Sequence, residues 1–324
     1  MCKKILYSCD TGIDDALALL YLAAQDKCEL VGITASYGMG HVYNVYRNTK
    51  YVLSLLGRDD IPLKMGSDRE LSGIPYDYSN GSRFHGIEGL GGVLGEACVE
   101  DCEGAEVEEA TDFIIDLSHK YGKELIWVTS GPFTDIARVL RKDPDICDRI
   151  GAVYVMGGAV ASPGNVGNYK EVWMEANVRI DVPAAKEVLE SRLPIVLVGL
   201  DVTRKTLFSY EDHERWHKLG TKSALFFYEA LKHYLGAYKE YHPYLGGCGL
   251  HDPLAAVAAV NPEILTTIPM HLTCYTDGPQ RGRTVEDVLR CNDPHYDTKV
   301  ALLVDTKAFQ EEFFARTEEL LSKI

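Results

Sequence analysis

Short apolar runs alternate with helical segments along most of this chain, and that alternation limits the folds that the chain can adopt. The run Ile5–Ser8 leads into Asp10-Thr11-Gly12, after which Ala16–Leu20 begins a helical pattern. Strands separated by helices of this length favour right-handed crossovers and a parallel sheet. We therefore predict an α/β fold with a mainly parallel, doubly wound sheet that carries helices on both faces.

The same alternation of strand and helix continues to residue 198. The further strands that we expect are 30–34, 125–128, 152–156 and 195–198. The helices that we expect between them are 42–56, 108–121, 134–140 and 184–190. After Asp201 the chain becomes richer in helix, with expected helices at 222–241 and 253–260, strand-like runs at 266–275 and 299–304, and a closing helix from Phe309. Because no low-complexity linker interrupts the sequence, we predict one domain over residues 1–324 with a helix-rich C-terminal portion.

Composition and charge exclude several classes of partner. The chain has 48 acidic against 33 basic side chains and a formal net charge of −15 at pH 7, whereas nucleic-acid binding normally needs clustered Lys and Arg. No stretch approaches the roughly eighteen apolar residues of a membrane span, and the first apolar run is too short for a signal peptide. The nine cysteines form no Cys-x-x-Cys pair, which suits reduced thiols. We expect a soluble cytoplasmic protein that binds neither nucleic acid nor a membrane.

Polar side chains follow the predicted strands at the points where those strands end. Asp10, Asp14 and Asp15 come after the first strand, Ser130 after the strand at 125–128, and Asn165 shortly after the strand at 152–156. Ligands of open parallel sheets bind in the crevice outside the carboxyl ends of the strands. We therefore expect these side chains to line one ligand site.

The three aspartates near the N-terminus favour a bound cation. Asp14 and Asp15 fall at a helix start, where carboxylates also serve as simple caps for free N–H groups. Capping does not explain Asp10, which adds a third carboxylate to the same small volume. Three close carboxylates repel one another unless a cation or a proton offsets their charge, and oxygen-only ligands favour Ca²⁺ or Mg²⁺.

Two further segments carry candidate functional groups. His251-Asp252-Pro253 opens a helix, where Asp252 has the alternative role of a plain N-cap. The glycine-rich segment 84–92 lacks the Lys-Ser/Thr ending of a phosphate-binding loop. We expect this segment to be a mobile flap that presents one imidazole, that of His85.

Seven short motifs, taken together and in order, resemble the inosine-uridine nucleoside hydrolase family. They are DTGIDDA at 10–16, HGIEGLG at 85–91, SGPFTD at 130–135, MGG at 156–158, GNV at 164–166, EAN at 175–177 and HDP at 251–253. Each motif alone is weak, but the ordered set is specific and spans nearly the whole catalytic fold. The resemblance implies hydrolysis of the N-glycosidic bond of ribonucleosides to ribose and free base, with bound Ca²⁺. It also implies a homodimer or a homotetramer.

The resemblance assigns roles to residues of this chain. Asp10, Asp15 and Asp252 should bind Ca²⁺ together with the backbone carbonyl of Ser130, and Asp10 should also deprotonate a water held by the ion. Breaking a ribosyl C–N bond passes through an oxocarbenium-like sugar, which nearby carboxylates stabilise. His251 should protonate or hydrogen-bond the departing base, since its unperturbed pKa is near 6.5.

The remaining assignments concern substrate contacts. Those expected on the sugar are Asp14, Asn165, Glu175 and Asn177. Those considered for the base are His85, Tyr238, Tyr241 and Tyr244. Tyrosines at helical spacing more often pack against a neighbouring helix, so packing remains the alternative for the three tyrosines.

Several positions depart from the pattern of the family. This chain has Ser8 where the family usually has Asp, Thr11 where it has Pro, and Met39 where it has Asn. Ala176 replaces the aromatic residue that usually separates the two polar residues of the 175–177 motif, which makes the pocket roomier near the 5′ side of the sugar. Loss of the Asn implies a shifted substrate, a substitute such as Asn44, or poor activity on ordinary nucleosides.

Other classes of protein share parts of this pattern. An aspartic protease pairs two Asp-Thr/Ser-Gly loops, but only Asp10-Thr11-Gly12 is present, and the helix-rich pattern contradicts an all-β fold. A dehalogenase-like phosphatase needs an aspartate two residues from Asp10, where this chain has Ser8. The serious alternative is a calcium-dependent protein of the same fold that binds or senses ribosyl ligands with weak or no turnover.

Overall fold

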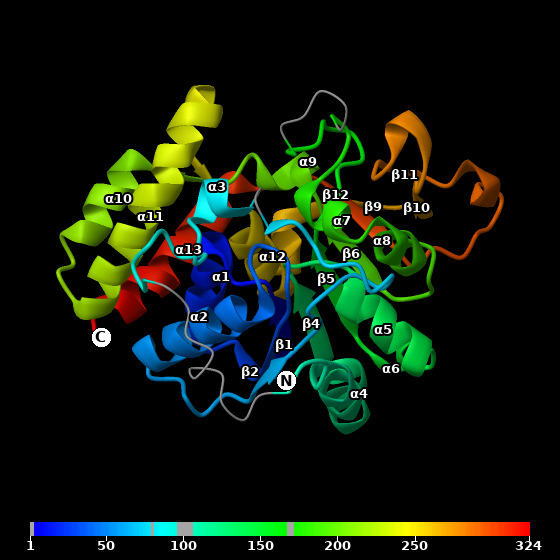
Figure 1. The fold of residues 1–324 in the computed structure, drawn as a ribbon, viewed down its shortest axis with the longest axis horizontal. Helices are drawn as coiled ribbons and strands as arrows, with labels where there is room; N and C mark the ends of the chain where they lie inside the picture. The colour runs from blue at the N-terminus through cyan, green and yellow to red at the C-terminus, as the bar shows by residue number, and fades with distance from the viewer. Residues whose placement is uncertain (1–2, 79–80, 96–105, 167–171) are drawn as a thin grey trace.

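The computed structural model describes residues 3–78, 81–95, 106–166 and 172–324, which surround a mainly parallel eight-stranded sheet (Figure 1). The strand order is β3-β2-β1-β4-β5-β6-β12-β9, and every neighbouring pair is parallel except β12 and β9. The strands are β1 Lys3–Cys9, β2 Cys28–Ala35, β3 Leu63–Met65, β4 Leu125–Thr129, β5 Ala152–Met156, β6 Ile195–Val198, β9 Leu265–Pro269 and β12 Lys299–Val304. The predicted parallel sheet is confirmed.

Helices connect these strands and cover the sheet. The longer ones are α1 Ile13–Ala23, α2 Val42–Leu55, α4 Ala110–Tyr121, α5 Thr134–Lys142, α8 Val182–Leu189, α10 Tyr210–His217, α11 Lys222–Tyr241, α12 His251–Val260 and α13 Thr306–Leu321. The short ones are α3 Gly81–His85, α6 Ile146–Arg149, α7 Ala176–Ile180 and α9 Leu200–Thr203. Two small antiparallel pairs, β7 Leu207–Ser209 with β8 Gly247–Gly249 and β10 Leu272–Cys274 with β11 Thr284–Glu286, complete the fold. No helix within the described ranges is long and apolar enough to cross a membrane.

Alternate residues of each central strand serve two separate hydrophobic clusters. On β1, Ile5 and Tyr7 pack with α1, α2, α11, α12 and α13, whereas Leu6 packs with α4, α5 and α8 on the opposite face. Successive strand side chains point to opposite faces, so a strand buried on both faces must be apolar at every position. This explains why the central strands appear in the sequence as continuous apolar runs, and it confirms the expected helices on both faces.

The order of the strands creates a crevice beside β1. The chain moves from β1 to β2 and β3 on one side, and then crosses to β4, β5 and β6 on the other side. At such a switch point the connections leave neighbouring strands in opposite directions, which opens a crevice at their carboxyl ends. Asp10 directly follows β1 and Ser130 directly follows β4, so both residues lie at this crevice.

The helix α12 brings a late segment of the chain to the same place. All ten of its residues are buried, and it packs against α1, β4 and β5. Its sequence after Pro253 consists only of Ala, Val and Leu, which lets it approach its neighbours closely on every side. Its first turn therefore lies beside the first turn of α1.

Several elements differ from the expectations. The strand-like run 266–275 forms two strands in different sheets, β9 and β10, and the helix expected at 184–190 begins earlier, at Val182. The helix α12 begins at His251 rather than at 253, since a proline is tolerated in the first turn. The closing helix begins at Thr306, because the carboxylate of Asp305 caps it by accepting from the N–H of Ala308. In the expected flap 84–92, the first two residues instead end the helix α3.

Candidate active site

A cavity opens at the carboxyl ends of the central strands, and most of the side chains selected from the sequence line it. They are Asp10, Asp14, Asp15, His85, Ser130, Asn165, Glu175, Asn177, His251 and Asp252. Tyr241 and Tyr244 are not among the lining residues, whereas Tyr238 is. Tyr241 packs against Phe84 and Arg83 instead, and Tyr244 is 77% exposed.

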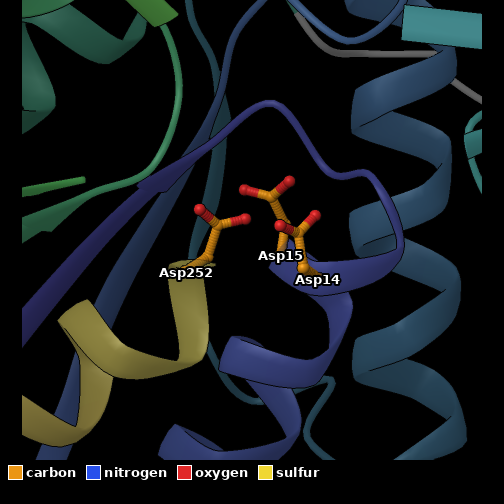
Figure 2. Close-up of side chains that lie close together, drawn as sticks. All are labelled: Asp14, Asp15 and Asp252. Carbon is orange, nitrogen blue, oxygen red and sulfur yellow. The ribbon is translucent and has the colours of Figure 1, made fainter. Parts of the chain in front are cut away.

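Three carboxylates form a tight cluster at this cavity. Asp14 and Asp15 come from the first turn of α1 and Asp252 from the first turn of α12, and Figure 2 shows their side chains pointing toward one another. One ligand oxygen from each residue lies within 4.8 Å of those of the other two, and all three residues are buried. Acidic side chains from opposite ends of the chain therefore meet here.

Asp10 lines the same cavity but lies outside this tight cluster. Its Oδ2 accepts a 2.5 Å hydrogen bond from the backbone N–H of Met39. A glycine is required just before this N–H, because Gly38 has a φ of 151° and a Cβ there would lie 2.2 Å from the same oxygen of Asp10. The contact with Asp10 at position 39 is thus made by a backbone N–H. Asn44, which was considered as a substitute for the missing asparagine, is not among the residues that line the cavity.

Donors from several elements fix the orientation of Asp15. Its Oδ1 accepts from the hydroxyl of Ser130 at 2.5 Å and from that of Tyr7 at 3.3 Å, and its Oδ2 accepts from the N–H of Gly12 at 2.9 Å. The backbone carbonyl of Ser130 accepts from Nδ2 of Asn177 at 2.8 Å. A carbonyl oxygen has two lone pairs, so this hydrogen bond leaves the carbonyl able to bind a cation as well.

Burial raises the pKa of all four aspartates at the cavity, and mutual repulsion raises it further for three of them, Asp10, Asp14 and Asp252. For Asp10 and Asp252 the pKa lies well above its ordinary value, first because of burial and then because of the neighbouring aspartates. The same causes raise the pKa of Asp14 to about 7, and burial raises the pKa of Asp15. A cation would offset exactly this accumulation of negative charge, and carboxylate and carbonyl oxygens are the ligands that hard divalent ions prefer. The residues present therefore fit a divalent metal ion.

The raised pKa values predict how the stability of the metal-free protein depends on pH. The pKa of Asp14 is about 7 in the fold against an ordinary 3.8, so the proton is held more tightly in the folded than in the unfolded chain. Its contribution to stability is therefore complete below the ordinary pKa and is lost as the pH rises through about 7. Melting curves of chelator-treated protein should show a falling Tm as the pH rises from about 3.8 to about 7, and an added divalent cation should raise the Tm most at the upper end of this range. A metal-free Tm that rises across this range would contradict the cluster.

Both ring nitrogens of His251 are occupied within the protein. Its Nε2 shares a 2.7 Å hydrogen bond with the hydroxyl of Tyr238, and its Nδ1 shares a 2.8 Å hydrogen bond with the hydroxyl of Thr203. Burial lowers the pKa of His251 to about 3, so the ring is neutral at physiological pH. The ring of Tyr238 packs edge to face against that of Tyr234 with centroids 5.0 Å apart, and the Tyr234 hydroxyl donates to Oδ2 of Asp14 at 3.2 Å. Side chains in contact thus connect His251 to the carboxylate cluster.

His85 is fixed at the N-terminus of α1. Its Nδ1 accepts a 3.0 Å hydrogen bond from the backbone N–H of Ile13, and its ring lies against that of Tyr234 with centroids 5.1 Å apart. Burial lowers the pKa of His85 to about 3. Because Nδ1 is an acceptor, the neutral ring carries its proton on Nε2. The close approach also requires Gly12, where a Cβ would lie 2.6 Å from Nδ1.

Backbone hydrogen bonds hold the side chains selected as sugar contacts. Glu175 caps the helix α7, with Oε1 accepting from the N–H of Asn177 at 3.0 Å and Oε2 accepting from the N–H of Gly158 at 3.0 Å. Oδ1 of Asn165 accepts from the N–H of Ala176 at 2.9 Å. These groups line the cavity in orientations that the main chain sets.

Thr203 and Tyr234 are parts of this site that were not predicted from the sequence. Thr203 lies on α9, directly after the strand β6, so the rule that selected Asp10 and Ser130 would also have selected it. Tyr234 lies one helical turn before Tyr238, and its place on the same face of α11 was the available signal.

Comparison with known proteins identifies the family. A family model described as inosine-uridine preferring nucleoside hydrolase matches residues 5–311. The chain belongs to this nucleoside hydrolase family. The match spans most of β1, all of α12 and the first part of α13, so it covers both segments of the chain that supply the carboxylate cluster.

Individual relatives agree with this nucleoside hydrolase assignment. The solved structure of a purine-preferring ribonucleoside hydrolase from Gardnerella vaginalis has 39% sequence identity and a TM-score of 0.93, covering 99% of this chain and 100% of that one. An inosine-uridine preferring nucleoside hydrolase of Crithidia fasciculata is 31% identical over 313 residues, 95% of both chains. A pyrimidine-specific ribonucleoside hydrolase of Klebsiella pneumoniae is 30% identical over 310 residues, 95% of this chain and 96% of that protein.

Family membership establishes the class of reaction. The chain is an N-ribosyl hydrolase, and its substrate is a small-molecule nucleoside. This favours the enzyme over the ligand-binding alternative that the sequence left open. The family is metal-dependent, in agreement with the cluster of Asp14, Asp15 and Asp252.

Proposed function

We propose that this nucleoside hydrolase uses Ca²⁺ to release the base from ribonucleosides, with Asp10 as general base and with His251 assisting the departing base through Tyr238. The proposal depends on one observation: the cluster of Asp14, Asp15 and Asp252 lines the same cavity as Asp10 and His251. The ring of His251 is hydrogen-bonded to Tyr238 and Thr203. When bound, the ion supplies positive charge and Lewis acidity and binds vicinal hydroxyl groups.

The ligands that we assign to the ion are Asp10, Asp15, Asp252 and the backbone carbonyl of Ser130. Several features support this set: all four line the cavity, all are buried, and Asp15 is already oriented by neighbouring donors. We assign Asp14 to a sugar hydroxyl, since the Tyr234 hydroxyl donates to one of its oxygens and leaves the other available. Asn165, Glu175 and Asn177 would contact the rest of the sugar.

Asp10 is suited to accept the proton of the attacking water. The N–H of Met39 holds one of its carboxylate oxygens in place, and the other oxygen remains to accept a proton in the cavity that Asp10 lines. The carboxylates around it also stabilise the positive charge that develops on the sugar as the C–N bond breaks.

The neutral ring of His251 acts on the base through a neighbour in this proposal. When Thr203 donates to Nδ1, the proton of His251 is on Nε2, and the Tyr238 hydroxyl links it to the cavity. Tyr238 lines the cavity and is therefore placed to donate a hydrogen bond to the leaving base. His85, which also lines the cavity, is proposed to contact the base through its Nε2–H.

A base-release assay with and without calcium tests this function. We expect turnover of purine or pyrimidine ribonucleosides, loss of turnover on chelation, and recovery with Ca²⁺. One relative is named as purine-preferring and another as pyrimidine-specific. The panel of substrates should therefore contain inosine, guanosine, adenosine, uridine and cytidine. The matching 2′-deoxynucleosides serve as controls for recognition of the diol. Release that is indifferent to chelation, or no release from any nucleoside, would refute the proposal.

Replacing Tyr238 with Phe tests the route from His251 to the base. We expect Tyr238→Phe to slow hydrolysis of natural nucleosides by about 10²-fold, the lower end of the usual general-acid contribution. Hydrolysis of p-nitrophenyl riboside should change little, because its leaving group departs without a proton. Tyr241→Phe, outside the cavity lining, is the matched control. Equal slowing of both substrates would remove Tyr238 and His251 from this role.

Three further properties are proposed on more general grounds. Residues 1–324 would form one domain, because the single central sheet draws strands from both ends of the chain. The resemblance to the family supports a homodimer or homotetramer. The cysteine usage of the sequence supports a cytoplasmic location.

A further inference from the structure

The short helix α9 is hydrogen-bonded to the first part of the loop that leads from β5 to Asn165. The N–H of Leu200 donates to the carbonyl of Gly158 at 2.9 Å, where the loop leaves β5. The carboxylate of Asp201 then accepts from the N–H groups of Val160 at 2.9 Å and of Ala161 at 2.7 Å. This first half of the loop is therefore tied to α9 at three successive points.

Arg204, which caps the C-terminal end of α9, holds the second half of the loop. Its two terminal nitrogens donate to the carbonyl of Pro163 at 2.8 Å and to the carbonyl of Gly164 at 2.6 Å. Asn165 follows directly and lines the cavity. The planar guanidinium fixes two adjacent peptide groups together, which the single ammonium of a lysine cannot do with the same geometry.

The same helix also holds His251. Thr203, the residue before Arg204, shares the 2.8 Å hydrogen bond with Nδ1 of His251. The helix α9 with its capping residue thus contacts both the loop that carries Asn165, a proposed sugar contact, and the imidazole of His251, which is proposed to assist the departing base. A displacement of this helix would move both together.

We propose that Arg204 is a positioning residue for substrate binding. It fixes the loop that carries Asn165 against α9, so that the sugar is held at the correct distance from His251 and Tyr238. This inference rests on the proposed role of Asn165 as a sugar contact. Arg204 itself is not among the residues that line the cavity. Its positive charge also lowers the pKa of His251, after burial, and Arg204→Lys, which keeps that charge, separates this effect from the loss of the hydrogen bonds to the loop. Because small displacements of substrate-positioning groups weaken catalysis, loss of the two hydrogen bonds should be measurable in binding.

A double-mutant cycle between Arg204 and Asn165 tests the inference. We expect Arg204→Ala to raise the KM for nucleosides and the inhibition constant of free ribose by about tenfold, the effect of one net hydrogen bond to a charged group. Asn165→Ala should have a similar effect. If Arg204 acts through Asn165, the double variant should be no worse than Asn165→Ala, whereas independent roles would give multiplied effects.

Two further measurements separate positioning from a general loss of stability. Free guanidinium, at concentrations that leave the Tm unchanged, should restore the KM of Arg204→Ala, and methylammonium should not. Arg204→Lys keeps the charge and a single donor nitrogen, so its KM should lie between those of wild type and Arg204→Ala. If Arg204→Ala does not fold, Arg204→Lys takes its place in the double-mutant cycle. Lys205→Met is the matched control, because Lys205 also donates to a backbone carbonyl, that of Leu302 on β12, and should leave KM unchanged.

The outcomes distinguish this inference from the proposed function. Multiplied effects in the cycle, or an unchanged KM in Arg204→Ala, would overturn the positioning role while leaving nucleoside hydrolysis intact. Wild-type protein that releases no base from any nucleoside would overturn the proposed function instead. An effect of Asn165→Ala on kcat alone would also overturn the inference, since binding of the sugar would then not depend on the loop.

Discussion

Asp10→Asn is expected to lower kcat by about 10²–10⁴-fold, the usual contribution of a general base, while the protein still binds a metal ion. The amide cannot accept a proton from water, but its oxygen can still accept the hydrogen bond from the N–H of Met39. The three carboxylates of the tight cluster, those of Asp14, Asp15 and Asp252, remain. Metal analysis and single-turnover kinetics of the purified variant measure the two properties separately.

A matched control for this substitution is Asp135→Asn. Asp135 is also buried and also accepts a backbone N–H, that of Ser67, but it is not among the residues that line the cavity. We expect its kcat to equal that of wild type. If Asp10→Asn keeps full kcat, another group must accept the proton. If it loses the ion, Asp10 is an essential ligand and its two roles cannot be separated in this way.

Asp252→Asn is expected to abolish both metal binding at micromolar calcium and base release. Asp252 is one of the proposed ligands of the ion and belongs to the tight carboxylate cluster, and removal of its charge weakens a hard-cation site strongly. The metal-free variant, in contrast, should be more stable than metal-free wild type at neutral pH. The reason is that Asp252 has a raised pKa caused by burial and then by Asp14 and Asp15, so its charge costs the metal-free fold stability.

Isothermal titration with Ca²⁺ and melting curves with and without chelator measure these two opposite effects. Asp305→Asn is the control for loss of one negative charge at a helix start, because asparagine caps a helix about as well as aspartate and Asp305 caps α13 outside the cavity lining. It should leave both the calcium affinity and activity unchanged. Calcium binding by Asp252→Asn with wild-type affinity would remove Asp252 from the metal site.

The sequence was sufficient to predict the sheet because its strands are buried on both faces. A run such as Leu125–Val128 has apolar residues at every position, and the structure places it at the centre of the sheet as β4. The rule for carboxyl ends of parallel strands then selected Asp10, Ser130 and Asn165, all of which line the cavity. These features depend on the local pattern of apolar residues and on the order of strands and helices, and both can be inferred from the sequence.

The hydrogen-bond partners in the site were not visible in the same way. His251 lines the cavity, but the partners of its ring nitrogens, Tyr238 and Thr203, come from different elements and could not be identified from the sequence. The contact of Asp10 with position 39 is made by a main-chain N–H, so the identity of the side chain there gave no signal. Partners of this kind depend on how helices pack, and packing is decided by the whole chain.

The expected flap shows a further limit of local pattern. Glycines at 86, 89, 91 and 92 predict irregular structure, and all four have positive φ angles. Phe84 and His85 are nevertheless the last turn of α3, and the ring of Phe84 packs against Tyr238 and Tyr241 of α11. That tertiary contact favours helix over the irregular conformation that the glycines suggest for their neighbours.

The position of Asp252 on α12 has a consequence for biosynthesis. During translation the aspartates of α1 leave the ribosome first, while the carboxylate that completes their cluster is still about three quarters of the chain length away. The growing polypeptide therefore has no complete carboxylate cluster until α12 has emerged and docked. Chains that end before residue 252 lack one of the three carboxylates, so we expect them to release no base.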